Sequence, residues 1–296
     1  MKRVFPFLFA ICLMLTGCGG GESSSELPTE LVVSGGSEHQ ETEEAALFPF
    51  EINGTEVKEE AKCVVSLSPA VTEIIAELGY SDKLCGISSY CDHPEGLEVQ
   101  TVGSAENPDM DILAGLAPDV LFTISPLSER DVYALEDIGT AVISLEVPAS
   151  VEDYGRLYSD IASVFVGKEA AAKESEAAVK ALEDKAAGAF SGTYIYVTPK
   201  MTAAGAGTIE NAVLSLCGEN ICTGEGYCML SDIGEVQPDV IIAGDELTAD
   251  DINADDVLSA LVYNGAKVVY VPSVRFERPS ARISEVFDLI REQVAE

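Results

Sequence analysis

Basic residues are scarce in this 296-residue chain, which has 17 lysines and arginines against 51 aspartates and glutamates and a formal net charge of −34. Nucleic acids and anionic membrane surfaces attract clustered positive charge, so neither is an expected partner. The acidity favours solubility, and it would steer a basic partner surface towards the chain.

Catalytic signatures are also lacking. The sequence contains no Gly-x-Ser-x-Gly, no Walker loop and no His-Glu-x-x-His, and its only histidines are His39 and His93. A histidine-based triad would have His93 as its one candidate base, because His39 lies in a polar segment near the N-terminus. We therefore expect a protein that is not an enzyme, and a hydrolase would require a serine within about 3 Å of His93.

Long apolar runs are absent as well. After Lys2 and Arg3 comes an apolar run of about a dozen residues, shorter than the roughly 20 that a membrane-spanning helix needs. A basic start followed by a short apolar run predicts a signal peptide, here over residues 1–17.

The end of this signal points to a lipid anchor. Leu-Thr-Gly before Cys18 resembles the bacterial lipobox, in which the cysteine thiol carries a diacylglycerol and becomes the new N-terminus. Ordinary secretory cleavage is the alternative. Residues 18–45, rich in glycine, serine, glutamate and threonine, predict a flexible tether. The mature chain is therefore expected on the outer face of the cytoplasmic membrane, or in the periplasm, anchored through Cys18.

Six cysteines remain beyond the signal and the anchor: Cys63, Cys85, Cys91, Cys217, Cys222 and Cys228. Cys63 and Cys85 could face each other on neighbouring strands, but six cysteines allow 15 pairings and the sequence does not choose among them. The last three lack Cys-x-x-Cys spacing, so structural zinc is not expected. The acidic stretch 248–256 lacks the glycine and glutamate of a calcium loop and predicts a helix start instead.

Apolar runs alternate with helical patterns along the rest of the chain, which predicts an α/β fold with mostly parallel sheets. The first lobe, residues 46–165, should have strands at 63–68, 83–88, 118–125 and 141–146 and helices at 69–79, 110–116 and 129–139. The second lobe, residues 191–296, should have strands at 192–200, 238–244 and 267–273 and helices at 211–218 and 257–265. Residues 110–122 and 230–242 correspond closely, so two similar lobes are expected.

The lobes are predicted to be joined by a helix over residues 166–190. Alanine, glutamate and lysine dominate this stretch, and all three are strong helix formers. A helix of about 20 residues is roughly 30 Å long, enough to cross from one lobe to the other. Such a stiff connection predicts lobes that rock slightly rather than close widely.

Four segments, in this order, resemble the substrate-binding lipoproteins of ABC importers for cobalamin and iron chelates such as siderophores and haem. They are "CVVSLSPAVTEIIAELGYSDKLCGISSYCDHPEG", "NPDMDILAGLAPDVLF", "NAVLSLCGENIC" and "SVRFERPSARI". The cobalamin-binding members are nearest, through "SSYCDHP" and "FERPSAR". The resemblance implies a monomeric binding protein without a cofactor of its own. It would hold a metal chelate between two lobes and deliver it to a membrane permease and its ATPase.

The ligand-binding candidates lie in loops after predicted strands and in the last of these segments. They are Tyr90, Asp92, His93, Ser125, Met201, Tyr227, Arg275, Phe276 and Arg278. Ligands of open α/β sheets bind at the carboxyl ends of strands, which favours such positions. Ordinary loop roles are the alternatives, with Asp92 shaping its own turn and Arg275 forming a surface salt bridge.

The stretch "SSYCDHPEG" also raises the question of a metal site. Cys91, Asp92 and His93 are adjacent, and adjacent side chains do not easily point at one ion. No second cluster in the sequence supplies the missing ligands. We therefore expect a ligand loop here and no metal bound by the protein itself.

Two acids are candidates for permease docking, because in the family one acidic residue on each lobe meets arginines of the permease. Asp111, seven residues before Pro118, matches the first. The position seven before Pro238 is Ser231, with Asp232 next to it. A shift of one residue turns a helical side chain by about 100°, so Glu235 competes with Asp232 for this role.

The chain has no tryptophan, whereas the cobalamin binders line their cleft with it. Tyr90, Tyr227 and Phe276 could supply the flat apolar contacts that a corrin ring needs. Arg275 and Arg278 could instead bind haem propionates, a carboxylate siderophore or a corrinoid phosphate through their planar forks. We rank a corrinoid above an iron chelate, and a ligand sensor without transport is a further alternative.

Overall fold

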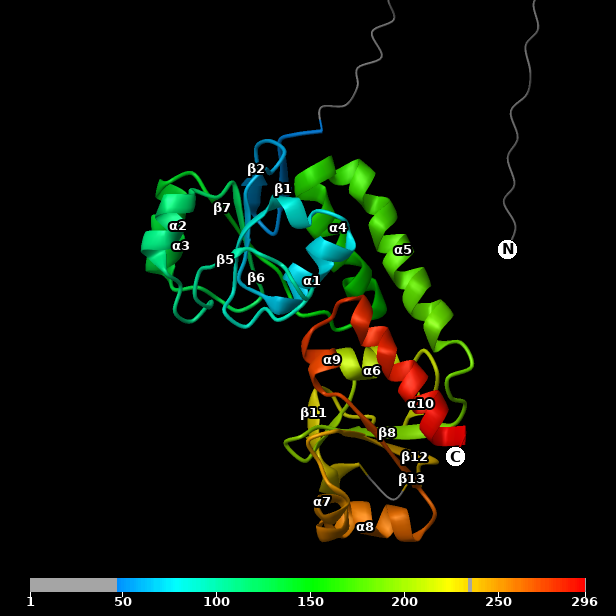
Figure 1. The fold of residues 1–296 in the computed structure, drawn as a ribbon. Coiled ribbons are helices and arrows are strands. Elements are labelled where there is room, and N and C mark those ends of the chain that lie inside the picture. Colours follow the sequence, from blue (N-terminus) through cyan, green and yellow to red (C-terminus); the bar gives the residue numbers. More distant parts are fainter. Residues whose placement is uncertain (1–46, 234–235, 296) are drawn as a thin grey trace, which may run out of the picture. The chain divides into compact units, whose positions relative to one another are not determined.

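The computed structural model describes residues 47–233 and 236–295 (Figure 1), which belong to one compact unit. The predicted signal peptide, the lipidation site Cys18, the tether and Glu235 lie outside the described residues. Within the described part of the chain, no helix is long and apolar enough to cross a lipid bilayer.

The first lobe is built on a parallel sheet with the strand order β5-β4-β3-β6-β7. Its strands are β3 (Val64–Ser66), β4 (Leu84–Ile87), β5 (Gln100–Thr101), β6 (Val120–Thr123) and β7 (Ala141–Ser144). Its helices are α1 (Pro69–Glu77), α2 (Met110–Leu116) and α3 (Glu129–Asp137). A hairpin that the sequence did not predict, β1 (Phe50–Ile52) with β2 (Thr55–Val57), precedes them.

The second lobe has a mixed sheet with the order β11-β9-β8-β12-β13, and β10 also pairs with β8. Its strands are β8 (Thr193–Val197), β9 (Thr202–Ala204), β10 (Glu219–Asn220), β11 (Tyr227–Met229), β12 (Val240–Gly244) and β13 (Lys267–Val271). Its helices are α6 (Ile209–Leu214), α7 (Ala249–Ala254), α8 (Asp256–Tyr263), α9 (Val274–Glu277) and α10 (Glu285–Ala295). The pairs of β9 with β8 and β11 are antiparallel and the others are parallel, so the predicted fold class is confirmed.

Each central strand alternates between two hydrophobic clusters, as a sheet covered on both faces requires. In β8, Tyr194 and Tyr196 enter one cluster and Ile195 and Val197 the other. In β6, Phe122 and Leu121 divide in the same way between the first cluster and a third. The first cluster contains residues of both lobes, so one continuous core runs across them.

The repeated Pro-Asp-Val sequence makes the same structure in both lobes. The Oδ2 atom of Asp119 accepts hydrogen bonds from the backbone N–H groups of Lys62 and Cys63, at 2.7 and 2.9 Å. The Oδ2 atom of Asp239 accepts from the Thr193 N–H at 2.7 Å and from its hydroxyl at 2.9 Å. In each lobe the aspartate at the start of one strand thus accepts hydrogen bonds from backbone N–H groups at the start of the neighbouring strand. This shared role explains the internal repeat.

Two helices connect the lobes where the sequence predicted one. Helix α4 (Val151–Val166), which was not predicted, contributes six buried side chains to the shared core. It ends at Gly167, whose φ of 80° breaks the helix, and α5 follows at Lys168–Ala186. The predicted linking helix of 166–190 is therefore shorter at both ends. Lys168 at its start donates through Nζ to the carbonyl of Glu51 in β1, and Lys185 near its end pairs with Asp288 of α10.

A disulfide joins Cys63, just before β3, to Cys85 of the neighbouring strand β4. The strand pattern had indicated that these two cysteines could face each other. The tertiary structure selects this pair from the 15 arrangements that the sequence allows. The cross-link closes a loop that contains α1, the helix that carries the contacts between the lobes.

Helices α4 and α5 pack closely because α4 has a glycine at the contact. A Cβ atom at Gly155 would lie 2.6 Å from Ser175 Oγ and 2.7 Å from Val179 Cγ2. We predict that Gly155→Ala lowers the free energy of unfolding by about 1–3 kcal/mol, because the methyl group overpacks this contact. Denaturant unfolding measures the change.

Gly115→Ala in α2 is the matched control, because a Cβ atom there meets nothing within 4 Å. This variant should gain about 0.5–1 kcal/mol from the better helix propensity of alanine. Equal stabilisation by both substitutions would contradict the close packing of α4 on α5.

Candidate ligand-binding site

The first lobe presents Tyr90 and Ser125 at the carboxyl ends of its strands. Tyr90 follows β4 and Ser125 follows β6, and these two strands flank β3 on either side. The strand order reverses at β3, and ligands of open α/β sheets bind at such a switch point. Tyr90 is 64% exposed and Ser125 is exposed too, so both side chains are free to meet a ligand.

The second lobe presents Met201 and Tyr227. Met201 lies in the turn between β8 and β9 with a φ of 58°, and its half-buried side chain packs on the core of this lobe. Tyr227 in β11 is 58% exposed, and its hydroxyl donates to Glu210 of α6 at 3.0 Å. Partial burial and the nearby carboxylates of Glu210 and Glu277 raise the pKa of Tyr227 to about 12, so its hydroxyl stays protonated.

Two predicted ligand residues bind each other across the lobes. The Arg278 guanidinium forms a close ion pair with Asp92, and it donates to the backbone carbonyl of Tyr90 at 3.4 Å. The hydrogen bond from Arg278 lowers the pKa of Asp92, so this carboxyl is charged at neutral pH. Tyr90, Asp92 and Arg278 are thus brought together, and the charge of Arg278 is already compensated.

Arg275 and Phe276 differ from the sequence expectation. Arg275 donates through Nε to Glu285 at 2.8 Å, which makes the salt bridge that was the alternative to ligand contact. Phe276 is only 2% exposed, and its ring packs edge-on against Tyr196 with centroids 5.0 Å apart. Its place in the shared core therefore keeps this ring out of contact with a ligand in the present conformation.

Two residues of "CDH" have separate partners. The Cys91 thiol lies 3.1 Å from the Thr72 hydroxyl, and Asp92 pairs with Arg278. His93 is half-buried in the same loop. Among residues 47–233 and 236–295, no group of three or more His, Cys, Asp or Glu side chains could hold a metal ion.

Two glutamates that the sequence analysis missed hold the lobes together from α1. Glu73, only 1% exposed, accepts from Ser280 Oγ at 2.6 Å and from Arg282 at 3.3 Å, and Arg278 lies 3.6 Å away. Glu77 accepts from the Ala281 N–H at 3.1 Å. Their spacing of four residues on an otherwise apolar helix was the available signal, because it puts both carboxylates on one face.

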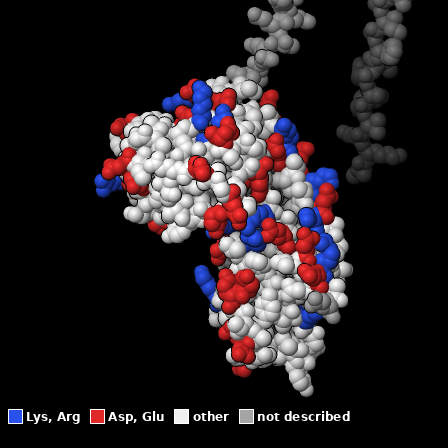
Figure 2. All heavy atoms as spheres, viewed as in Figure 1, with Lys and Arg blue, Asp and Glu red and all other residues white. Residues whose placement is uncertain are grey.

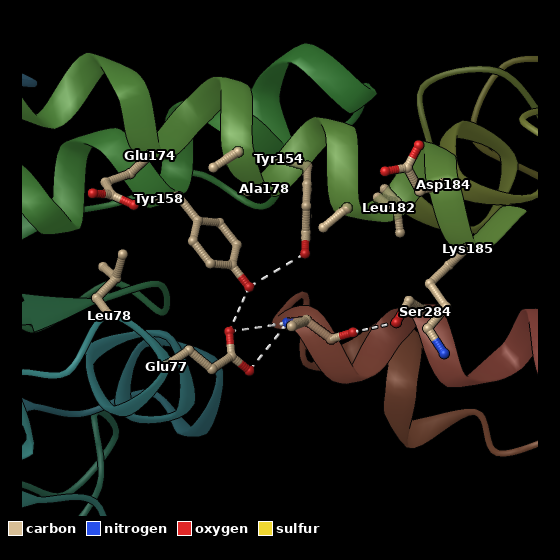
Figure 3. A pocket seen from close by; sticks show the side chains of 13 residues that line it. Glu77, Leu78, Tyr154, Tyr158, Glu174, Ala178, Leu182, Asp184, Lys185 and Ser284 are labelled. Carbon is tan, nitrogen blue, oxygen red and sulfur yellow. Dashed lines mark hydrogen bonds between the residues drawn. The ribbon is translucent and has the colours of Figure 1, made fainter.

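Glu77 also joins α4 to this contact. Tyr158 donates to Glu77 at 2.6 Å, and Tyr154 donates to Tyr158 at 3.2 Å, as the dashed lines in Figure 3 show. Burial raises the pKa of Glu77 above its usual value, and the hydrogen bonds from Tyr158 and Ala281 oppose this rise. One carboxylate therefore connects α1, α4 and the 3₁₀ turn at Ala281–Ser284.

A cavity of about 630 Å³ lies beside this network, lined by α1, α4, α5 and the turn at Ala281–Ser284 (Figure 3). Its α1 residues are Glu77 and Leu78, at the end of the helix that runs back from the carboxyl edge of β3. The cavity therefore lies at the linking helices, away from the strand ends that carry Tyr90 and Ser125.

The two predicted docking acids are exposed and lie on corresponding elements. Asp111 is in the first turn of α2, after the N-cap Asp109. Asp232 ends the short 3₁₀ turn at Leu230–Asp232 and accepts from the Ser231 hydroxyl at 3.1 Å. A full helix in one lobe thus corresponds to a single turn in the other, although the sequences align.

Comparison with known proteins gives a family match. The periplasmic binding protein family matches residues 64–202, which run from the first core strand through α4 and α5 into the second lobe. This match covers somewhat less than half of the chain.

Relatives of this chain carry names that refer to cobalamin binding and to ABC transport. A cobalamin-binding protein of Halobacterium salinarum is 25% identical over 281 residues, which cover 84% of this chain and 75% of that protein. An uncharacterized ABC transporter substrate-binding lipoprotein of Bacillus subtilis is 24% identical over 164 residues. That alignment covers 53% of this chain, which spans only 48% of the Bacillus protein's length.

A solved structure of a periplasmic haem-binding protein of Vibrio cholerae has the same fold. It superposes with a TM-score of 0.64 at 18% identity, covering 79% of this chain and 99% of that one. The relatives thus have named ligands of more than one chemical class.

We predict that Glu73→Gln lowers the free energy of unfolding of this protein by about 2–3 kcal/mol. The variant removes a buried charge that compensates Arg278 and Arg282. Glu285→Gln, which removes a half-exposed partner of Arg275 and Arg282, should cost about 0–1 kcal/mol. Denaturant unfolding separates the two, and equal losses would show that burial of Glu73 has no special importance.

Proposed function

We propose that this chain is the extracytoplasmic substrate-binding lipoprotein of an ABC importer. It captures a corrinoid between its lobes and delivers it to a membrane permease, anchored by lipid at Cys18. The match of residues 64–202 to the periplasmic binding protein family and the name of the Halobacterium relative support a binding role, and the sequence before residue 47 supports export and anchoring. The chain acts as a binding protein and not as an enzyme.

The choice of ligand rests on three arginines whose charges are already compensated by carboxylates of the chain. Arg275 pairs with Glu285, Arg278 with Asp92 and Glu73, and Arg282 with Glu73 and Glu285. A guanidinium that already has a carboxylate partner gains little from a second anion, because the ligand must first displace a bonded carboxylate. Arg275 and Arg278, which the sequence suggested as partners for haem propionates or a carboxylate siderophore, are therefore poor anion-binding groups.

The second lobe adds negative charge near the same place. Glu210 and Glu277 act on the pKa of Tyr227, so both carboxylates lie near this exposed ring. Figure 2 shows carboxylates spread over both lobes, with lysines and arginines gathered in fewer places. An anionic chelate would be repelled here, whereas a corrinoid, whose rim carries neutral amides, would not.

Tyr90 and Tyr227 replace the missing tryptophans. Tyr90 belongs to the first lobe and Tyr227 to the second, and each lies next to the segment of Glu277 and Arg278. Both rings are exposed, so they offer flat apolar surface to a macrocycle. Ser125 and Met201 border the same strand ends, and His93 and Asp92 complete the loop of the first lobe.

Other functions have weaker support. The haem-binding structure favours an iron chelate by fold alone, and the charge arrangement opposes it. A hydrolase would need a serine hydroxyl hydrogen-bonded to His93, and among the described residues no such hydrogen bond is present. A ligand sensor would bind its ligand between the same two lobes. It would not need Asp111 and Asp232 for docking on a permease, so variants at these two acids distinguish a sensor from a transport protein.

We predict that the full chain binds cyanocobalamin in titration calorimetry, while haem and ferric citrate do not bind. Tyr90→Ala and Tyr227→Ala should each weaken binding about 5–100-fold, because an aromatic contact of 1–3 kcal/mol is lost. Tyr263→Ala, at a ring that is 91% exposed on α8, is the matched control and should bind normally. Tight binding of haem alone would refute the corrinoid choice.

We predict that Asp111→Lys combined with Asp232→Lys abolishes corrinoid uptake by cells while ligand affinity stays intact. The reversed charges would repel the arginines expected on the permease. Glu136→Lys with Glu292→Lys makes the same change of charge at exposed helix positions and should leave uptake normal. Unchanged uptake in the first variant would mean that other residues dock on the permease.

A further inference from the structure

A hydrogen bond joins the exposed ring of Tyr227 to a buried carboxylate. The Tyr227 hydroxyl lies 3.0 Å from Oε1 of Glu210 and 3.2 Å from Oε2, so it donates to this carboxylate. The tyrosine is 58% exposed, whereas Glu210 is only 7% exposed. None of the ion pairs in the described part of the chain includes Glu210. The phenol of Tyr227 thus takes the place that an arginine has beside the buried carboxylate of Glu73.

The helix that carries Glu210 is held from both sides. Thr208, the N-cap of α6, accepts from the Asn211 N–H at 3.2 Å, and its hydroxyl donates to the Gly205 carbonyl at 2.8 Å. The amide of Asn220 in β10 donates to Asn211 Oδ1 at 2.9 Å and to a backbone carbonyl of β9 at 2.8 Å. The backbone of Glu210 is therefore fixed to the neighbouring strands.

The strand that carries Tyr227 is held just as closely. The Gly205 N–H donates to the Gly226 carbonyl and the Ala206 N–H to the Gly224 carbonyl, both at 2.8 Å. A Cβ atom at Gly205 would lie 2.1 Å from the Gly224 oxygen, so only glycine allows this approach. Tyr227 follows this contact directly and pairs with β9. The backbone at both ends of the phenol–carboxylate bond is thus fixed independently of that bond.

The ring of Tyr227 is the part that the backbone does not fix. More than half of this side chain is open to solvent, and exposed side chains change rotamer within picoseconds to nanoseconds. A second attachment at the far end of the ring, through the hydroxyl, opposes rotation about its side-chain dihedrals. The hydrogen bond to Glu210 therefore selects one orientation of the ring.

We propose that Glu210 is a positioning residue, which fixes the Tyr227 ring in the orientation that the ligand meets. This role rests on the proposed function, because it concerns the ligand only if Tyr227 contacts a corrinoid. A side chain that becomes ordered on binding lowers the affinity. A ring that is ordered beforehand avoids this loss, so Glu210 raises the affinity without touching the ligand.

Tyr227→Phe keeps the ring and removes only its hydroxyl. We expect this variant of the full chain to bind cyanocobalamin about 3–10-fold more weakly in titration calorimetry, the effect of one side chain that is ordered on binding. Glu210→Ala should cause a loss of the same size, since it removes the other end of the same bond. Glu219→Ala, at an exposed acid of the same lobe, is the matched control and should bind normally.

The double variant Glu210→Ala with Tyr227→Phe separates positioning from a general effect on the lobe. Two substitutions that remove one bond are not additive, so the double variant should bind about as weakly as either single variant. Losses that multiply would overturn the role of Glu210. Glu210→Gln keeps an oxygen acceptor and should restore the affinity to within about 2-fold of the wild type. A loss as large as that of Glu210→Ala would contradict positioning through the hydroxyl.

Carbon-13 NMR tests the hydrogen bond without any ligand. The chain is labelled at Cζ of tyrosine, and the Tyr227 signal is the one that Tyr227→Phe removes. Donation to a carboxylate places negative charge on the phenol oxygen and moves the Cζ signal downfield. We expect Glu210→Ala to move the Tyr227 signal towards that of Tyr263, whose ring is 91% exposed. An unmoved signal would show that Glu210 does not hold the ring.

The corrinoid proposal and the positioning role of Glu210 fail by different results. If the wild-type chain does not bind cyanocobalamin, the corrinoid proposal fails, and the NMR signal still decides whether Glu210 orients the ring. If the wild type and Tyr227→Phe bind cyanocobalamin equally well, the corrinoid proposal stands and the positioning role is wrong.

Discussion

The buried carboxylate of Glu73 is the contact on which the relation of the two lobes depends. It receives Ser280 and Arg282 from the second lobe, with Arg278 close by, while Glu77 one turn later receives the Ala281 backbone and Tyr158. A buried charge is costly unless it is fully paired. The segment 278–282 must therefore keep its place against α1, and it carries with it the ion pair of Arg278 with Asp92.

This polar contact works together with the shared core and the paired helices. The first hydrophobic cluster contains residues of both lobes, and α4 packs on α5 through Gly155. The lobes are thus connected by packed helices and by buried hydrogen bonds, which favours small rocking motions over wide closure. A ligand between the lobes would mainly have to rearrange the half-exposed pair of Asp92 and Arg278.

The same pairing decides the chemistry of the proposed site. Arg275 and Arg278 are the side chains that would suit an anionic ligand. Their positive charges are compensated by carboxylates of this chain. Tyr90 and Tyr227 remain open to solvent at the strand ends. The proposed corrinoid follows from this pairing of the arginines and from the two exposed aromatic rings.

The sequence by itself determined the α/β fold, the predicted core strands and the internal repeat, because burial and helix signals are local and periodic. It missed the short strands β1, β2, β5, β9, β10 and β11 and the helices α9 and α10. It also missed α4, whose apolar face shows only against the shared core. Only the tertiary structure decided the partners of side chains: Cys63 with Cys85, Asp92 with Arg278, and Phe276 in the core. These contacts join residues far apart in the chain, and no local pattern records which distant group a side chain will meet.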